Sequence, residues 1–278
     1  MSGTHERRRG GFIEYTIEGL LATLNRAVSA DALAKGDGLL QRLDPRVKLA
    51  GLLALIAATA LAARLWVIGG ILALAVLLAL LSRLSLRFLV APVWLSAFTF
   101  TGAIAIPAIF LTPGTAIWRV PSLDWPVTAQ GITTASYLIL RVEASVTLGL
   151  LLIFTTPWNH VLKALRIFRV PVVFVVILGM TFRYILLLLE TAHEMFESRK
   201  SRTVGRLTSG DYRQIAMSSG GVLLGKTFQL SNEVYLAMQA RGFRGEVYVM
   251  DEFRMAGADW MALALFAGSA AAAIWAGR

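Results

Sequence analysis

Long runs without a charged side chain constrain the fold of this chain more strongly than any other feature. No Asp, Glu, Lys or Arg occurs from residue 65 to residue 82 or from residue 88 to residue 118. A helix needs about 20 predominantly apolar residues to cross the hydrocarbon core of a bilayer. Only 16% of all residues are charged, against roughly 25% in soluble domains. The sequence therefore predicts an all-α fold, that of a polytopic helical membrane protein.

Five segments are predicted to be transmembrane helices. The first two form a hairpin with Arg64 at its tip, and the loop after the third contains tryptophans of the kind found at membrane interfaces. The last is rich in alanine, which allows close packing between helices. The predicted spans are residues 47–63, 65–82, 88–111, 131–154 and 260–275.

The net charge of +10 comes from Lys and Arg residues that flank the apolar runs. They form no stripe interleaved with aromatic residues, so no nucleic-acid partner is predicted. Positive residues instead mark the cytoplasmic side. If the N-terminus is cytoplasmic and residues 170–190 do not cross, all 27 Lys and Arg residues are cytoplasmic except Arg64, Arg119, Arg141 and Arg278. The uncharged run in residues 170–182 has only 13 residues before Arg183 interrupts it, which is short for a membrane crossing. A crossing at 170–190 would also move ten of the positive residues outside, so we predict that this segment lies half sunk in the bilayer.

These assignments divide the chain into four parts. Apolar residues at helical spacing in residues 12–34 predict an amphipathic helix on the membrane surface or on a neighbour. The four predicted parts are an N-terminal amphipathic cytoplasmic segment (1–46), a four-helix transmembrane region (47–154), a block of cytoplasmic and interfacial helices (155–254) and a C-terminal transmembrane helix (255–278).

Arg141 and Glu143 lie within the fourth predicted span. Because they are two residues apart, they point to different sides of the helix. A charged side chain facing lipid costs a few kcal/mol, so both are expected to face the interior of the bundle. Structural pairing is favoured, and a functional role is the alternative.

The sequence contains no clear catalytic or metal-binding constellation. It has no cysteine, which excludes disulfides, thiolate catalysis and Cys-based metal sites. By spacing, Glu190, His193, Glu194 and Glu197 share a helix face. This face fits either a metal site or a solvated surface with salt bridges, and the second is favoured. We predict no catalytic residue, no metal ligand and no cofactor.

Residues 220–227, GGVLLGKT, match the phosphate-binding pattern G-x-x-x-x-G-K-[ST]. That loop works only between a strand and a helix, where backbone N–H groups surround the phosphates. Here no strand is predicted before the match, and a helix is predicted from about residue 208 to about residue 242. The match is attributed to chance, and Gly220 and Gly221 are interpreted as a bend or packing point.

Two other features remain to be explained. In LDPRVKL, residues 43–49, Asp44 suits the N-cap and Pro45 the first position of a helix, while Arg46 and Lys48 are expected at the lipid headgroups. The polar stretch 187–244 carries two arginines, each between small residues that let a partner approach closely while the guanidinium reaches a carboxylate or carbonyl. The predicted docking triplets are Ser201-Arg202-Thr203 and Ala240-Arg241-Gly242.

Together these segments resemble the transmembrane (T) component of energy-coupling-factor (ECF) transporters. LDPRVKL resembles its N-terminal signature, and TTPWNHVLKAL (155–165) resembles the segment after its fourth span. FRYILLLLETAHEMFESRKSRT (182–203) and YLAMQARGF (235–243) resemble its two coupling helices. Details such as SRKSRT are most similar to the cobalt branch, CbiQ. The resemblance covers nearly all of residues 40–278.

The resemblance implies an energy-coupling scaffold of an ABC importer in the bacterial inner membrane, for cobalt or possibly nickel, linked to cobalamin biosynthesis. Two copies of an ATPase subunit (CbiO-like) would dock at Arg202 and Arg241. A substrate-binding membrane subunit (CbiM-like) and a small accessory subunit (CbiN-like) would complete the complex. Ser201 and Thr203 differ from the Ala and Gly of the family motif, so the first dock is expected to differ in detail or to be weaker.

Two other functions are alternatives for such a chain. A stand-alone secondary transporter or channel should show inverted repeats and helices broken near the middle of the membrane, and neither is evident in the sequence. A P-loop nucleotide-binding membrane protein should have an α/β domain, for which the chain offers no segment.

Overall fold

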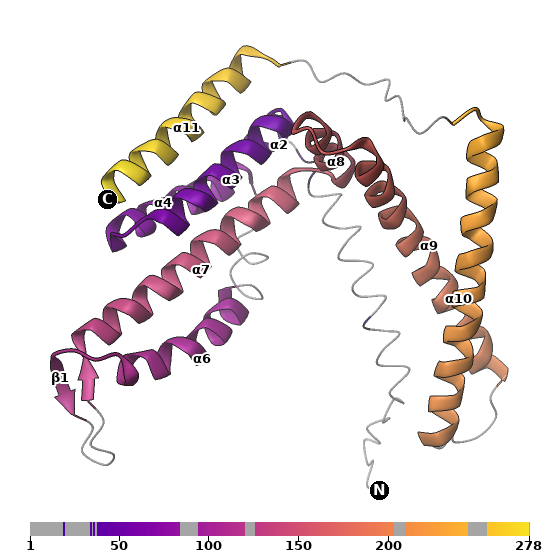
Figure 1. Cartoon of the computed structure of the whole chain (residues 1–278), viewed down its shortest axis with the longest axis horizontal. Helices are drawn as coiled ribbons and strands as arrows, with labels where there is room; N and C mark the ends of the chain where they lie inside the picture. Colours follow the sequence, from indigo (N-terminus) through magenta and orange to yellow (C-terminus); the bar gives the residue numbers. More distant parts are fainter. Residues whose placement is uncertain are drawn as a thin grey trace, which may run out of the picture. The chain divides into compact units, whose positions relative to one another are not determined.

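The computed structural model describes residues 38–83, 94–119, 126–202, 209–243 and 255–277, together with residues 19, 34 and 36. The chain divides into two compact units. The bundle unit comprises Ala30–Ile167 and Asp251–Arg278, and the helix-pair unit comprises Met1–Ser29 and Phe168–Met250. Helices dominate the described residues of both units, which confirms the predicted fold class (Figure 1).

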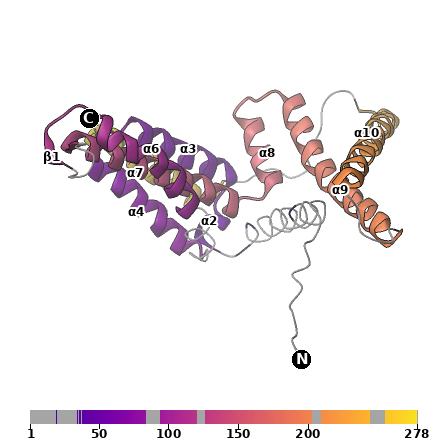
Figure 2. The same cartoon turned by 90° about the horizontal axis from the view of Figure 1, so that it is seen from below.

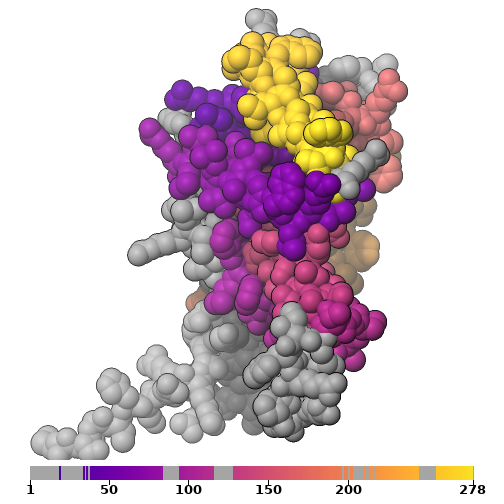
Figure 3. Space-filling view, turned by 90° about the vertical axis from the view of Figure 1, so that its left-hand side faces the viewer, coloured from indigo at the N-terminus to yellow at the C-terminus, as the bar shows by residue number. Residues whose placement is uncertain are grey.

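The bundle unit is organised around its longest helix, α7. Its helices are α2 (Leu39–Arg42), α3 (Pro45–Leu61), α4 (Leu65–Leu81), α6 (Leu95–Leu111), α7 (Ala129–Thr155), α8 (Trp158–Ile167) and α11 (Gly257–Gly277). Helices α3, α4 and α6 pack against α7, and α8 packs against α3. Helix α11 packs against α3 and α4, and in Figure 3 its yellow surface lies directly on their indigo and purple surface.

Polar side chains at helix starts explain where two of these helices begin. Asp44 accepts a hydrogen bond from the backbone N–H of Arg46 at 2.8 Å, and Pro45 occupies the first position of α3, as predicted. Thr128 caps α7 by accepting from the N–H of Gly131 at 3.0 Å. Both caps pair backbone donors that a helix start leaves unbonded.

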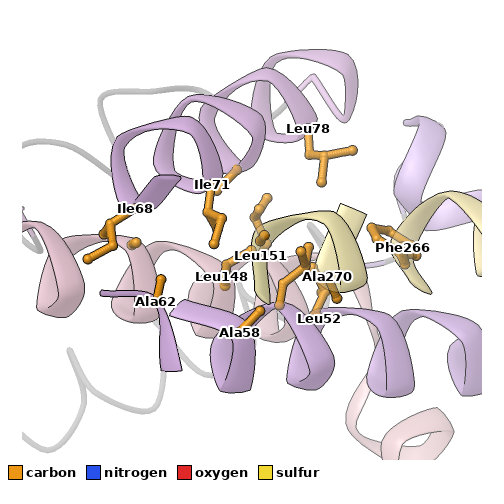
Figure 4. Close-up of a cluster of buried hydrophobic side chains, with 14 of the residues drawn as sticks. Leu52, Ala58, Ala62, Ile68, Ile71, Leu78, Leu148, Leu151, Phe266 and Ala270 are labelled. Atoms are coloured by element: carbon orange, nitrogen blue, oxygen red, sulfur yellow. The ribbon is translucent and has the colours of Figure 1, made fainter. Parts of the chain in front are cut away.

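A cluster of buried apolar side chains from α3, α4, α7 and α11 forms the core of the bundle unit (Figure 4). Leu52, Ile68 and Leu148 are fully buried in it. Because lipid is as apolar as these side chains, close packing stabilises the cluster more than removal from water does. The packing depends on small residues: a Cβ atom at Gly51 would lie 2.5 Å from the ring of Phe266 in α11.

A short antiparallel hairpin joins α6 to α7. Its strands are β1 (Ala116–Arg119) and β2 (Pro126–Thr128), the exception to the helical fold in the part of the chain that is described. Next to the hairpin the backbones of α6 and α7 nearly touch, because a Cβ atom at Gly131 would lie 2.4 Å from the carbonyl oxygen of Ile109. Only glycine fits this position without a backbone shift.

The described residues of the helix-pair unit form two long helices, α9 (Val172–Arg202) and α10 (Ser209–Ala240). They contact each other toward the C-terminal end of α9, where Arg199 Nη1 donates a hydrogen bond to Ser218 Oγ at 3.0 Å (Figure 2). Helix α10 confirms the helix predicted from about residue 208 to about residue 242.

Three described helices, α7, α9 and α11, are long and apolar enough to cross a membrane, and α4 and α6 are shorter apolar helices. These helices agree with a polytopic membrane protein. Helix α9 differs from our expectation, because it continues through Arg183 as one helix of 31 residues. The length of α9 is therefore no argument against a crossing at 170–190, and only the charge distribution supports the prediction that this segment does not cross.

Two predictions concern residues outside the described ranges. Residues 88–93, the first part of the predicted third span, are not described, and neither are most residues of the amphipathic helix predicted at 12–34. The second predicted span corresponds to α4, and α7 and α11 extend slightly beyond the spans predicted at 131–154 and 260–275.

Candidate functional site

The second triplet forms the C-terminal end of α10. Ala240 is the last helical residue, and Gly242 adopts the left-handed conformation with φ 75°. The N–H of Gly242 bonds to the carbonyl of Gln239 at 2.9 Å, and the N–H of Phe243 bonds to that of Met238 at 3.0 Å. This pair of bonds is the Schellman motif, which ends a helix and pairs carbonyls that would otherwise be unbonded.

The motif gives Gly242 a role that the sequence analysis missed. We interpreted this glycine as a small residue for close approach by a partner. A Cβ atom here would meet no other atom of the chain within 4 Å, but a left-handed φ strongly favours glycine. The missed signal was a glycine directly after a helix that ends in Ala-Arg. Gly242 thus ends α10 so that the exposed Arg241 stands at its terminus.

The first triplet occupies the corresponding end of α9. Ser201 and Arg202 are the last two residues of that helix, and both are exposed. Ser201 Oγ donates to the carbonyl of Ser198 at 2.9 Å, which keeps its side chain on the helix. Thr203 lies outside the described residues. Both triplet arginines therefore stand at C-terminal helix ends, within one unit and on two helices in contact.

The predicted alternatives on α9 and α10 receive no support from the geometry. No group of three or more His, Asp or Glu side chains in the described chain is arranged to hold a metal ion; Glu190, His193, Glu194 and Glu197 all lie within α9. Residues 220–227 lie inside the continuous helix α10. Their backbone N–H groups belong to the helix, so they cannot surround a phosphate.

The signature residues lie at the start of α3, where Asp44, Pro45 and Lys48 are buried. Asp44 and Pro45 begin the helix as predicted, and Arg46 is half-buried. Our expectation for Lys48 was wrong: its side chain is 1% exposed and does not reach outward to lipid headgroups. Its Nζ atom donates a hydrogen bond to the carbonyl of Thr155, the last residue of α7, at 2.8 Å. A cation suits this position because a helix C-terminus carries partial negative charge.

Asp259, in the first turn of α11, joins the signature residues and was missed by the sequence analysis. It is 5% exposed. Its Oδ1 atom accepts from the N–H of Asp44 at 2.8 Å, and its Oδ2 atom accepts from the N–H of Ala256 at 2.8 Å. The carboxylates of Asp259 and Asp44 both attract the positive charge of Lys48. An acidic residue at the start of an apolar helix was the available signal.

At the other end of α3, Arg141 has a structural role. Its Nη2 atom donates to the carbonyl of Ala62, the C-cap of α3, at 2.7 Å. Nearby, Tyr137 donates to the carbonyl of Ala63, whose N–H bonds to Gly277 at the end of α11 at 2.9 Å. The predicted pairing of Arg141 is thus confirmed, with the carbonyl group of Ala62 rather than an acid as its partner. Glu143 is 7% exposed, and its Oε2 atom has no hydrogen-bond partner in the described chain.

Comparisons with known proteins identify relatives over most of the chain. A sequence profile of the CbiQ family, described as cobalt transport protein, matches residues 37–249, which include the signature and both triplets. An uncharacterised protein of Methanocaldococcus jannaschii is 31% identical over 247 residues, covering 87% of this chain and 84% of that protein.

Two further relatives carry functional names. The cobalt transport protein CbiQ of Rhodobacter capsulatus is 28% identical over 166 residues, covering 55% of this chain and 68% of that protein. The energy-coupling factor transporter transmembrane protein EcfT of Streptococcus thermophilus is 25% identical over 221 residues, covering 76% of this chain and 83% of that protein.

Proposed function

Because this chain belongs to the CbiQ cobalt transport protein family, we propose that it is the energy-coupling membrane scaffold of an ECF-type importer for cobalt ions. Members of the family are membrane components of transporters and not enzymes. The chain is a multi-pass membrane protein with several apolar helices. Cobalt is the proposed cargo because one relative is named a cobalt transport protein.

One observation carries the proposal: the two triplet arginines occupy matching places. Arg202 ends α9, Arg241 directly follows α10, and both are exposed. Two similar helix ends on a pair of contacting helices suit two copies of one partner, and we propose two ATPase subunits in that position. Each guanidinium would reach a carboxylate or carbonyl in a groove of its ATPase.

The long helices supply the path by which ATP-driven motion would reach the membrane. Closure of the two ATPases would move the ends of α9 and α10, and the helices would pass this motion to a separate substrate-binding membrane subunit. Large apolar side chains remain exposed on both helices, including Phe174 (59%) and Phe228 (66%). Lipid and the substrate-binding subunit are their proposed partners, with a small accessory membrane subunit as a further component.

The proposed topology follows the charge distribution. The N-terminus and the block at 155–254 would be cytoplasmic, in the inner membrane of a bacterium, with spans within 47–154 and 255–278. An accessibility tag after Arg278 should then be labelled from outside the cell. Labelling only from the cytoplasmic side would contradict five crossings.

The role is tested by reversing the docking charge. The chain is expressed in a bacterium with its ATPase and membrane partners, purified through a tag, and assayed for bound ATPase and for cobalt uptake in vesicles. Arg241→Glu should remove most of the bound ATPase and the uptake, because a guanidinium facing an acidic or carbonyl-lined groove is replaced by a carboxylate. The protein should still insert into the membrane.

Arg64→Glu is the matched control. It makes the same change in net charge at an exposed residue in the turn before α4, and uptake should be unchanged. Wild-type ATPase binding and cobalt uptake in the Arg241→Glu protein would contradict the scaffold proposal. A wild-type chain that purifies alone and still moves solute in vesicles would instead support a stand-alone transporter.

A further inference from the structure

The start of α3 bonds both to the segment before the chain leaves the bundle unit and to the segment after it returns. The chain passes into the helix-pair unit after Ile167 and returns at Asp251. The departing chain runs from the end of α7 through α8, and the returning chain enters α11. On both sides a buried hydrogen bond ties the chain to the segment from Asp44 to Lys48.

On the departing side, the tie is the bond from Lys48 Nζ to the carbonyl of Thr155 at 2.8 Å. Thr155 and Thr156 are 0% and 3% exposed, so the end of α7 is enclosed. Helix α8 follows at Trp158 and packs against α3 as well. Only four residues, 168–171, separate α8 from α9, so displacement of the start of α9 is passed to α8 over a short connection.

On the returning side, the tie is Asp259. Its two carboxylate oxygens accept from the N–H groups of Asp44 and Ala256, both at 2.8 Å. The bond to Ala256 stabilises the start of α11 in the manner of a capping box, and the bond to Asp44 joins that start to α3. One carboxylate thus holds two segments that are far apart in the sequence.

We propose that Lys48 and Asp259 are positioning residues for energy coupling, which hold the departing end of α7 and the returning start of α11 on the same turn of α3. With both ends held, motion of the helix pair moves the whole bundle. If they were not held, the two segments that join the units would move without displacing the bundle. This inference rests on the proposed scaffold function for its effect on transport, but not for the geometry of the two ends.

The geometry is tested in the assembled complex by a distance measurement between spin labels. The chain has no cysteine, so Asn159→Cys in α8 and Ala258→Cys in α11, both at exposed positions, can be labelled specifically. Lys48→Met and Asp259→Asn should each broaden the distribution of distances between the labels. Asp259→Asn is the milder variant, since it keeps one acceptor oxygen. It therefore still tests the proposal if the Lys48→Met protein fails to fold.

Arg141→Met is the matched control. It also removes a bond from a cationic side chain to a carbonyl, but at the opposite end of α3, and it should leave the distance distribution narrow. Cobalt uptake per ATP hydrolysed should fall about tenfold in Lys48→Met, a typical size for coupling between sites, and should be retained in Arg141→Met. A purely structural role would lower the amount of folded complex without lowering uptake per ATP.

Each outcome decides a separate point. An unchanged distance distribution in both Lys48→Met and Asp259→Asn, or equal broadening in Arg141→Met, would contradict the proposal that Lys48 and Asp259 hold the two ends on α3. Broadening with unchanged uptake per ATP would overturn its role in coupling. A wild-type complex without bound ATPase would refute the scaffold proposal, while the spin-label distances would still decide whether Lys48 and Asp259 hold the two ends.

Discussion

The bundle unit and the helix pair differ in how they use their apolar side chains. In the bundle unit, residues from α3, α4, α7 and α11 enclose one another, and Leu148 is fully buried. In the helix pair, comparable side chains such as Leu224 (61% exposed) and Leu236 (62% exposed) face outward. The bundle unit therefore has an apolar core in addition to its exposed apolar surface, whereas the apolar side chains of the described helix pair are mostly exposed or half-buried.

The largest effect that tests this difference is expected from truncating one leucine in each unit. Leu148→Ala should lower the free energy of unfolding by about 2–5 kcal/mol, because it leaves a cavity in the packed core. Leu224→Ala, the matched variant on α10, should change it by less than about 0.5 kcal/mol. Thermal unfolding of the purified chain in detergent measures both. Equal losses would contradict the contrast between the units.

A smaller loss is expected where α6 and α7 approach each other. In Gly131→Ala the new Cβ atom would lie 2.4 Å from the carbonyl oxygen of Ile109, so the two backbones must separate at a cost of about 1–3 kcal/mol. Gly149→Ala, in the same helix, adds a methyl group with no neighbour within 4 Å and should cost nothing. The same unfolding assay tests the pair, and wild-type stability in Gly131→Ala would show that this approach is not tight.

Gly242→Ala tests whether the end of α10 is formed by its own backbone or by a partner. Alanine at φ 75° costs about 1–2 kcal/mol. If the Schellman turn positions Arg241, ATPase binding should weaken about tenfold, measured by titrating detergent-solubilised chain with ATPase. Gly242→Asn should weaken binding less, because asparagine tolerates the left-handed region. Equal ATPase affinity of the wild type, Gly242→Ala and Gly242→Asn would show that the turn does not contribute to docking.

The smallest effect is expected from Lys226→Ala. Because residues 220–227 lie within a continuous helix, their sequence match to a phosphate-binding loop has no matching geometry. ATP hydrolysis by the assembled complex should stay at the wild-type rate. Loss of hydrolysis, with the complex intact by size-exclusion chromatography, would indicate that this chain binds nucleotide through Lys226.

Most of the helical architecture was predictable because its signals are local. Asp44 and Pro45 mark the start of α3, and long apolar runs with few or no charged residues mark α4, α7 and α11. Helix α9 was underestimated because Arg183 was treated as an interruption, although a single charge does not break backbone hydrogen bonding. Gly242 was interpreted only as a small residue for close approach by a partner. Its role in ending α10 was missed because a glycine in the sequence fits either a need for small size or a left-handed φ.

The sequence by itself determined the membrane class, the places of the helices and the two arginine triplets, because each depends on residues within a few turns of one another. Only the tertiary structure decided what the buried charges do. Lys48 bonds to a residue 107 positions away, and Asp44 bonds to one 215 positions away. Such pairs arise when helix packing brings distant backbone groups together, and a buried polar side chain must then find its partner there.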